Sequence, residues 1–388
     1  MNIVFFDDQT WKNLNPITLT KPVADVRIGI LKISEKWKYF FSGSIFYKTE
    51  SYLSKKFLNN SIETVSCIFI NGSVLPNAEL ADEIKKLVPG EKLIYKDILV
   101  AYIPHENQAI ENSLLLYREK FFTGKLIVIR NLWEIFSLNA EALKLDFELI
   151  TQGRYSQELP SSNKYIKQQH IFIEEGAKVQ CCILNATEGP IYLGKNSEVM
   201  EGSVIRGPFA LCEGAVVKLA TKVYGATTVG PESRIGGEVN NSVIQGYSNK
   251  GHDGFIGNSV IGEWCNLGAD TNNSNLKNNY GNVDIWSYKD GKYVDTNLQF
   301  CGLFMGDHSK CGINTMFNTG TVVGVSANIF GAGFPEKFIP SFSWGGPQHP
   351  FQKFKLEKAL ELAEIVMSRR KIKITEEEKE VLKYLSEQ

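Results

Sequence analysis

The most regular feature of the chain is an aliphatic residue at every sixth position over a long central stretch. A period of six matches neither the 3.6-residue period of a helix nor the two-residue alternation of a strand. It is typical of a coil with three short faces per turn, each turning one aliphatic side chain inward. The pattern therefore predicts a parallel β-helix. The aliphatic series consists of Leu193, Val199, Ile205, Leu211, Val217, Val223, Val229 and Ile235.

The repeat continues further along the chain but is broken twice. A second run begins at Phe255, with Ile261 and Leu267, and a third extends from Met305 to Ile329. The register moves by two residues between Ile235 and Phe255, and a segment rich in Asn, Asp and Tyr separates Leu267 from Met305. We interpret both breaks as insertions between coils. Interruptions of a solenoid are where function usually lies.

Three segments make up the chain. Residues 1–160 alternate strand-like and helical runs, which predicts an α/β domain. A polar linker at residues 151–163 overlaps the end of this domain. The β-helix extends over residues 164–340, and residues 350–388 form a helical tail. The tail has helical spacing from Leu356 to Met367 and a capping box at Thr375. We expect it to close the open end of the coil. The strand-like runs are Ile3–Phe6, Cys67–Ile70, Leu93–Tyr102 and Leu126–Ile129, and the helical runs are Ala81–Leu87 and Ser113–Lys120.

The composition of the chain limits the kinds of molecule that the protein is expected to bind. A formal charge of −1 over 388 residues argues against nucleic-acid binding by a positive field, and no apolar stretch reaches membrane-spanning length. The N-terminus has no basic leader, which predicts a buried first strand and not an export signal. The seven cysteines, including the adjacent Cys181 and Cys182, lack zinc-like spacing and are expected to serve in packing. We expect a cytoplasmic protein that binds small molecules.

His252 lies at the first break of the repeat, before Gly254–Gly262 and Asn266–Leu276. This stretch resembles the acyltransferase half of the bifunctional N-acetylglucosamine-1-phosphate uridyltransferase / glucosamine-1-phosphate N-acetyltransferase family. The resemblance covers both domains in order and is strongest to a variant bacterial branch of sugar nucleotidyltransferases with an acetyltransferase-type β-helix. It implies a Rossmann-like nucleotidyltransferase domain, a left-handed β-helix, and a homotrimer with the active site between two coils.

The resemblance also assigns roles to residues around His252. His252 falls on the catalytic histidine, Phe255 on a substrate-contacting aromatic position, and Asn266 and Asn275 on active-site asparagines. An amine attacks the acetyl-CoA thioester as the free base, so a histidine within reach can take its proton. Lys250 would face the sugar phosphate. The expected activity is N-acetyl transfer from acetyl-CoA to an amino-sugar phosphate, in the biosynthesis of nucleotides of the UDP-N-acetylglucosamine type.

Three further residues are implied to contact the cofactor: Ala269, Asp307 and His308. We expect His308 at an exposed corner of the coil, where it is also a second candidate for the general base. The segment from Asn278 to Thr296 is rich in aromatic residues, which indicates either a subunit contact or a lid.

The N-terminal domain carries a partial signature. Leu14–Thr18 followed by Thr20–Pro22 resembles the signature of sugar-1-phosphate nucleotidyltransferases. Those enzymes begin with a glycine-rich loop that cradles the nucleotide phosphates, whereas Asp7–Asn13 contains no glycine. Ser73 stands where an Mg²⁺-binding Asp is expected.

Two interpretations of this domain remain. In one, the domain transfers a nucleotidyl group through a rearranged site whose residues supply both Mg²⁺ ligands and cations for phosphate. In the other, the domain is degenerate and binds a nucleotide sugar or supports the trimer. For the whole chain, the alternatives to acetyl transfer are a thymidylyl- or uridylyltransferase with a non-catalytic β-helix, and a non-catalytic scaffold. The residues of the rearranged site are Asp7, Asp8, Lys21, Asp25, Arg27 and Lys36.

Overall fold

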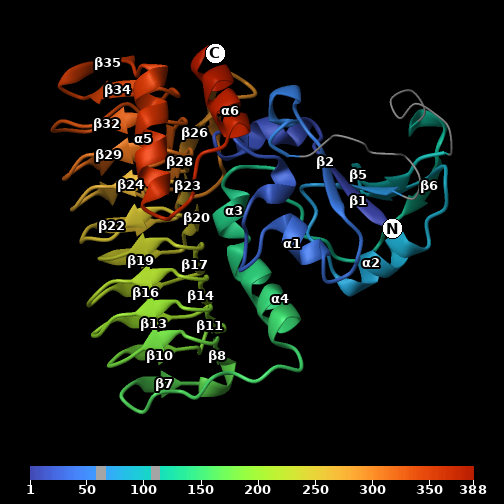
Figure 1. Cartoon of the computed structure of the whole chain (residues 1–388), viewed down its shortest axis with the longest axis horizontal. Helices are drawn as coiled ribbons and strands as arrows, with labels where there is room; N and C mark the ends of the chain where they lie inside the picture. Colours follow the sequence, from blue (N-terminus) through green and yellow to red (C-terminus); the bar gives the residue numbers. More distant parts are fainter. Residues whose placement is uncertain (58–66, 106–113) are drawn as a thin grey trace.

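The repeat builds a coil with three parallel sheets (Figure 1). The computed structural model describes residues 1–57, 67–105 and 114–388. All eight aliphatic residues of the first series are at most 2% exposed, so the predicted β-helix and its phase are confirmed there.

Each sheet forms one face of the coil. The first face consists of β7 (Lys164–Ile166), β10 (Ile183–Asn185), β13 (Val204–Arg206), β16 (Lys222–Tyr224), β19 (Glu238–Asn240) and β22 (Phe255–Gly257). The second face consists of β8 (Ile171–Ile173), β11 (Ile191–Leu193), β14 (Phe209–Leu211), β17 (Thr227–Val229), β20 (Val243–Gly246), β23 (Val260–Glu263), β28 (Leu303–Met305), β31 (Thr321–Val323) and β33 (Phe338–Ile339). The third face consists of β9 (Lys178–Val179), β12 (Glu198–Val199), β15 (Val216–Val217), β18 (Arg234–Ile235), β21 (Asn249–Lys250), β24 (Asn266–Leu267), β29 (Lys310–Cys311), β32 (Asn328–Ile329), β34 (Ser343–Gly346) and β35 (His349–Lys353). A separate pair, β25 (Asn272–Asn273) and β30 (Met316–Phe317), follows β22.

The first break in the repeat is a shortening and not an insertion. Only residues 236 and 237 separate β18 from β19, whereas the corners in the coils before and after contain residues 218–221 and 251–254. Phe255 consequently does not continue the inward series, because Ile256 is the buried residue of β22 and Phe255 is half-buried on the outside. The expected insertion and the inward phase of Phe255 are both wrong.

The second break is an insertion, as expected, and it folds back on its own coil. It contains the hairpin of β26 (Asp284–Ser287) and β27 (Lys292–Asp295). Ile285 is 2% exposed in a core cluster shared with the second face. Trp286 stacks on Phe338 with a centroid distance of 4.4 Å. The hairpin is thus packed against its own chain, whereas the sequence predicted either a lid or a contact with another subunit.

The N-terminal domain has a six-stranded mixed sheet in the order β2-β1-β3-β5-β4-β6. The run from Leu93 to Tyr102 is two antiparallel strands with a turn at Lys96, where φ is 55°. Leu126–Ile129 forms only an isolated bridge, and the described part of Ser113–Lys120 is not α-helical; Ser113 itself lies outside the described residues. The strands are β1 (Asn2–Phe6), β2 (Ile45–Lys48), β3 (Cys67–Asn71), β4 (Glu91–Tyr95), β5 (Ile98–Ile103) and β6 (Arg118–Phe121).

Short helices surround this sheet. The α-helices are α1 (Ile33–Trp37), α2 (Ala78–Lys85), α3 (Glu134–Ser137) and α4 (Asn139–Thr151). The 3₁₀ helices are η1 (Gln9–Leu14), η2 (Ile17–Leu19), η3 (Val23–Asp25), η4 (Ser51–Leu53), η5 (Leu114–Leu116) and, after the linker, η6 (Gln168–His170).

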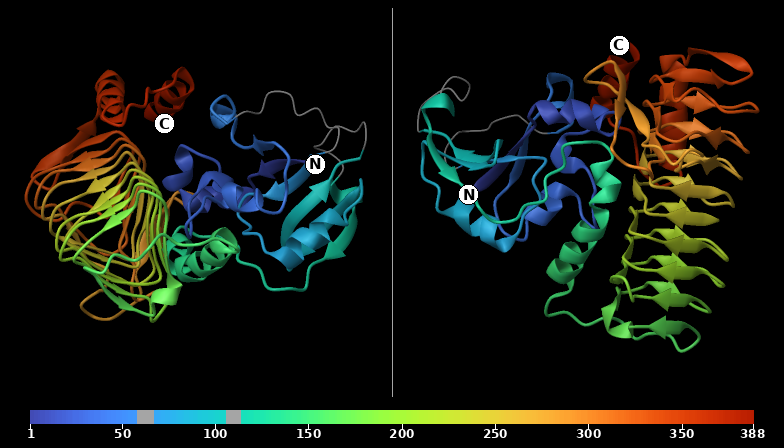
Figure 2. Two further views of the ribbon diagram at one scale, coloured as in Figure 1. Left: turned by 60° about the horizontal axis from the view of Figure 1, so that its bottom comes forward. Right: turned by 180° about the vertical axis from the view of Figure 1, so that it is seen from behind.

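The N-terminal domain packs against the second face of the coil (Figure 2). Arg27 and Gln245 join the two through reciprocal hydrogen bonds. The Arg27 backbone N–H donates to Gln245 Oε1 at 2.7 Å, and Gln245 Nε2 donates to the Arg27 carbonyl at 2.9 Å. The described residues of the N-terminal domain thus cover the second face and leave the first and third faces uncovered over most of the length of the coil.

The C-terminal tail forms α5 (Leu356–Ser368) and α6 (Glu376–Ser386). Thr375 caps α6 by accepting a hydrogen bond from the Glu378 N–H, as the sequence predicted. The helices bury Trp264, Val325 and Phe342 at the corner between the second and third faces. They lie alongside the coil and not across its open end (Figure 1), so the expected end cap is wrong. None of the helices in the described part of the chain combines the length and apolar character needed to cross a membrane.

Candidate functional site

His252 is exposed at the corner between the third and first faces. The loop of residues 251–254, which we call the His252 corner, is fixed from inside the coil by Lys250. The Lys250 Nζ donates to the carbonyl oxygens of His252 at 2.6 Å and Asp253 at 2.7 Å. The imidazole therefore extends from a backbone that is anchored at two successive carbonyls.

Lys250 does not have the role that the sequence predicted. It pairs with Ile235 in the ladder of the third face and occupies an inward position, with 4% of its surface exposed. Burial lowers the pKa of Lys250 to about 8. Because its ammonium group is bound to main-chain carbonyls inside the coil, it does not face a sugar phosphate.

Gly236 and Gly237 form the short corner directly beneath the His252 corner. A Cβ atom on Gly236 would lie 2.6 Å from the Gly251 carbonyl oxygen, and one on Gly237 would lie 2.6 Å from that of Gly254. Gly237 also has φ +75°, a conformation that L side chains rarely adopt. The two glycines let the His252 corner approach the coil below.

The predicted sugar contacts flank His252 on two faces. Asn266 is exposed on the third face and accepts a hydrogen bond from Asn249 Nδ2 at 3.0 Å. Phe255 and Asn275 lie on the first face, where both approach Gly257 closely. Asn275 Nδ2 donates to Asn258 Oδ1 at 2.8 Å. The three side chains thus lie on the two sides of a convex edge of the coil, and His252 lies on the edge itself.

The three predicted cofactor residues are not brought together. Ala269 lies in the corner above His252, where the Asp270 N–H donates to the Asp253 carbonyl at 3.0 Å. Asp307 and His308 lie instead at the corner between the second and third faces, and each is 3% exposed.

Contacts within the same chain explain the burial of these two residues. Asp307 Oδ2 accepts a hydrogen bond from Thr20 Oγ1 at 2.6 Å. His308 Nε2 lies 3.5 Å from Glu378 Oε1, beneath α6. The prediction of an exposed corner at His308 is wrong, because the C-terminal helix covers it. His252 is the histidine of the two that a bound substrate can reach directly.

The charged residues of the N-terminal domain separate into two groups. Asp7 and Asp8 lie at the carboxyl end of β1. Asp7 accepts hydrogen bonds from the Val23 N–H at 3.0 Å and Thr49 Oγ1 at 2.6 Å, and burial raises its pKa to about 7. Asp8 caps η1 by accepting from the Thr10 N–H at 2.8 Å and also accepts from Asn71 Nδ2 at 2.8 Å.

The other four charged residues serve packing between and within domains. Lys21 lies 3.1 Å from carboxylate oxygens of both Glu263 and Asp307 on the coil. Asp25 pairs with Lys32, Lys36 pairs with Asp146, and Arg27 binds Gln245. The structure therefore does not bring the six residues together in one place, because four of them pair with groups at the domain interface or near it.

The fit of Mg²⁺ to this domain is poor. All four carboxylate oxygens of Asp7 and Asp8 accept hydrogen bonds from protein groups. Ser73 is buried and donates its hydroxyl to Asn71 Oδ1 at 2.7 Å. Within residues 1–57, 67–105 and 114–388, no three His, Cys, Asp or Glu side chains gather where they would hold a metal ion.

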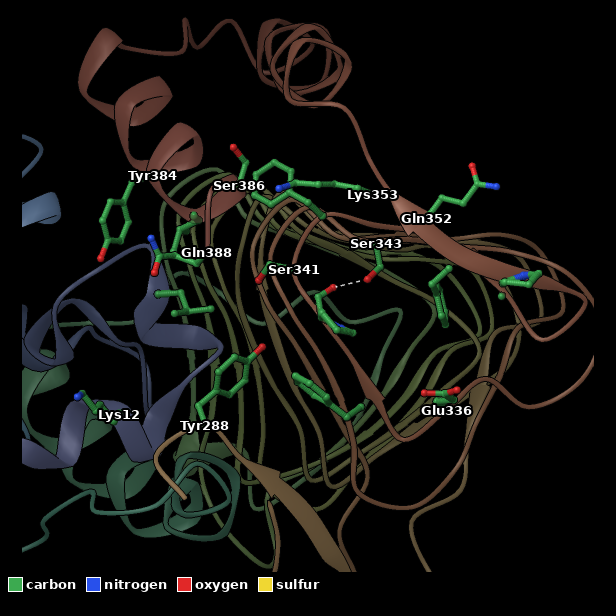
Figure 3. Close-up of a pocket in the computed structure, with 18 of the residues that line it drawn as sticks. Lys12, Tyr288, Glu336, Ser341, Ser343, Gln352, Lys353, Tyr384, Ser386 and Gln388 are labelled. Atoms are coloured by element: carbon green, nitrogen blue, oxygen red, sulfur yellow. Dashed lines mark hydrogen bonds between the residues drawn. The ribbon is translucent and has the colours of Figure 1, made fainter. Parts of the chain in front are cut away.

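A large cavity lies at the last coil of the β-helix (Figure 3). This cap cavity has a volume of about 1290 Å³. Its walls come from distant parts of the sequence: η1, η2, η4, the insertion hairpin, residues 334–353 and the end of α6. Sequence reasoning missed it, because no single segment carries its signature beyond the aromatic residues of the insertion.

Comparisons with known proteins agree with this architecture. Residues 3–155 match a family model described as sugar nucleotidyl transferase. The uncharacterized acetyltransferase YaiX of Escherichia coli (strain K12) is 23% identical over 189 residues, which cover 48% of this chain and 79% of the relative.

Two relatives are described as bifunctional. The sugar-1-phosphate nucleotidylyltransferase/acetyltransferase of Sulfurisphaera tokodaii is 29% identical over 145 residues, or 37% of this chain and 36% of the relative. The bifunctional protein GlmU of Methanocaldococcus jannaschii is 32% identical over 110 residues, or 28% of this chain and 25% of the relative. The matched segments thus cover about a third and a quarter of these two proteins.

Fold and comparisons together define the class of protein: the chain is a transferase, as predicted. More particularly, it joins a domain of the sugar-nucleotidyltransferase type to a left-handed β-helix of the acetyltransferase type.

Proposed function

We propose that the β-helix transfers an acetyl group from acetyl-CoA to the amino group of an amino-sugar phosphate, with His252 as general base. The observation that carries the proposal is the position of His252. It is exposed on an anchored corner and flanked by Asn266 on one face and by Phe255 and Asn275 on the other. The pathway would be the biosynthesis of sugar nucleotides of the UDP-N-acetylglucosamine type, in the cytoplasm.

In the proposed reaction, the amine nitrogen attacks the thioester carbonyl carbon and a C–N bond forms. His252 takes the proton that the nitrogen loses, the C–S bond breaks, and CoA leaves as a thiolate that gains a proton. Asn266 and Asn275 would orient the sugar and Phe255 would pack on it. Alignment of amine and thioester supplies much of the rate, so no covalent enzyme intermediate is needed.

We infer that the site is completed by a second copy of the chain, in a homotrimer. A convex edge offers one wall for a ligand, whereas ligand sites are concave. The first face beside the edge carries exposed apolar side chains, with Ile183 at 41% and Val204 at 38% exposed. Light scattering should give three times the chain mass of 43.5 kDa; the chain mass itself would contradict the shared site.

The second candidate is a sugar-1-phosphate nucleotidyltransferase whose β-helix only assembles subunits. The match of residues 3–155 to the sugar nucleotidyl transferase model favours it. Against it stand the missing glycine loop and the engagement of Asp7 and Asp8 by protein groups. Acetyl transfer therefore ranks first.

One assay separates the two candidates. Purified protein is incubated with amino-sugar 1-phosphates, UTP or dTTP, Mg²⁺ and acetyl-CoA, and free CoA and pyrophosphate are followed separately. Release of CoA that depends on the amino sugar supports acetyl transfer, and release of pyrophosphate alone supports the second candidate. If neither product forms with any pair, the β-helix is a scaffold and both proposals fail.

A further inference from the structure

The cap cavity is large enough for a small-molecule ligand and has a lining that suits one, and it lies apart from His252. Its 1290 Å³ exceeds the roughly 300–1,000 Å³ of most ligand pockets. Both domains contribute aromatic rings to its walls. The aromatic residues in the walls include Trp11, Tyr52, Tyr288, Phe338, Phe351 and Tyr384.

Tyr288 has a buried hydroxyl group with no protein partner at normal hydrogen-bond geometry among the described residues, and only the Ser341 hydroxyl lies close enough to lower its pKa. It faces the same part of the cavity as Ser341 (Figure 3). The ring is held from the side, because it packs edge-on against Phe338 at a centroid distance of 5.5 Å. A buried hydroxyl without a partner is costly, so its retention at a cavity wall points to a ligand that supplies the missing partner.

Charged groups line the cavity on opposite sides. Lys12 comes from the N-terminal domain and Lys353 from β35, and neither forms an ion pair in the described part of the chain. Figure 3 shows the two lysines on different walls, with Glu336 on a third. Free ammonium groups suit phosphate oxygens, and carboxylates accept hydrogen bonds from sugar hydroxyls.

The cavity also adjoins the edge of the N-terminal sheet where ligands are expected. β1 lies between β2 and β3 and is parallel to both, so the strand order reverses at β1. Open α/β sheets bind ligands outside the carboxyl ends of strands at such a point. Trp11 and Lys12 lie on η1, the helix that follows the carboxyl end of β1.

We propose that the cap cavity binds a sugar nucleotide between the N-terminal domain and the last coil. The base stacks on the aromatic walls, the diphosphate lies between Lys12 and Lys353, and Tyr288 donates to the ligand. The choice of ligand rests on the proposed function, since sugar nucleotides are the compounds to which that activity leads. The site lies at a different part of the coil from the His252 corner.

Calorimetric titration of the full chain tests the proposal, with UDP-N-acetylglucosamine, UDP-glucose, dTDP-glucose and GDP-mannose as probes. Wild type should bind at least one probe. Tyr288→Phe, which removes only the hydroxyl, and Lys353→Gln should each weaken that binding by roughly three- to tenfold. Tyr155→Phe, at a tyrosine that is 96% exposed, and Lys195→Gln, at an exposed corner, are the matched controls and should bind as wild type.

Two results would overturn the proposal: no binding of any probe by wild type, or binding that both cavity variants leave unchanged. The thermal midpoint of Tyr288→Phe without ligand should equal or exceed that of wild type, because the variant removes an unpaired group. CoA release is measured on the same samples. If wild type binds no probe but releases CoA normally, the cavity site alone is rejected. If wild type binds a probe but releases no CoA, the acetyl-transfer function alone is rejected.

Discussion

His252 and Lys250 are separated by one residue but lie in opposite environments. Lys250 occupies the inward position of its strand in the third face and is 4% exposed, whereas His252 lies beyond the end of that strand and is exposed. The spacing of the repeat alone did not reveal this difference, because Lys250 occupies a position that is aliphatic in most coils. Its two hydrogen bonds to the corner carbonyls make it a positioning residue for His252.

Asp7 gives a prediction about stability at the scale of one residue. Burial raises its pKa from 3.8 to about 7, so the folded protein binds a proton there that the unfolded chain has lost between these values. Stability should therefore fall as pH rises from about 4 to about 7. Asp7→Asn, which resembles the protonated acid, should remove part of this fall. Thermal midpoints of both proteins at pH 5 and pH 8 test it; equal pH dependence would contradict the prediction.

At the scale of elements, the His252 corner depends on the shortened coil beneath it. Local patterns predicted three features. The period of six predicted the coil and its inward residues from Leu193 to Ile235, and the helical spacing with the capping box at Thr375 predicted the tail helices. The period of six did not predict the shortening at Gly236. Residues lost from one corner and residues gained at another shift the register of the repeat in the same way, so the sequence does not distinguish them. It also could not show that Leu93–Tyr102 contains a turn.

Gly237→Ala tests the dependence of the corner on this close approach. The added methyl group would meet the Gly254 carbonyl oxygen at 2.6 Å and the Asp253 Cα at 2.9 Å. Gly291→Ala is the matched control, because Gly291 also has positive φ, +61°, but nothing lies within 4 Å of its Cβ position. Both should lose about 1 kcal/mol of stability from backbone strain, and Gly237→Ala should lose at least tenfold in CoA release as well. Equal CoA release by the two variants would refute the dependence.

At the scale of the whole molecule, buried charges join the two domains. Lys21 is 2% exposed and lies between Glu263 and Asp307 of the coil. Burial raises the pKa of Glu263, but the ammonium groups of Lys21 and Lys32 outweigh it and hold the pKa at about 2. No sequence pattern revealed this interface, because its partners are more than two hundred residues apart. The same holds for the cap cavity and for the covering of His308 by α6.

Lys21→Met should destabilise the protein by about 3–5 kcal/mol, because it leaves the buried carboxylate of Asp307 and the half-buried carboxylate of Glu263 without their shared cation. Lys55→Met, which removes an exposed pair with Glu380, should change stability by less than about 1 kcal/mol. Denaturant unfolding and proteolysis of the linker at residues 152–163 measure the effect. Similar unfolding midpoints and proteolysis rates for the two variants would show that Lys21 does not hold the domains together.

The rate of CoA release by His252→Gln is the sharpest test of His252 as the general base. It is measured with acetyl-CoA and whichever amino-sugar phosphate the wild type accepts, against His170→Gln, which alters an exposed histidine at the far end of the coil. Because His252→Gln removes the general base, its rate of CoA release should be at least about a hundredfold below that of wild type. The rate of His170→Gln should equal that of wild type, and both variants should be folded. A His252→Gln rate within about twofold of wild type would contradict the assignment of the acetyl-transfer site.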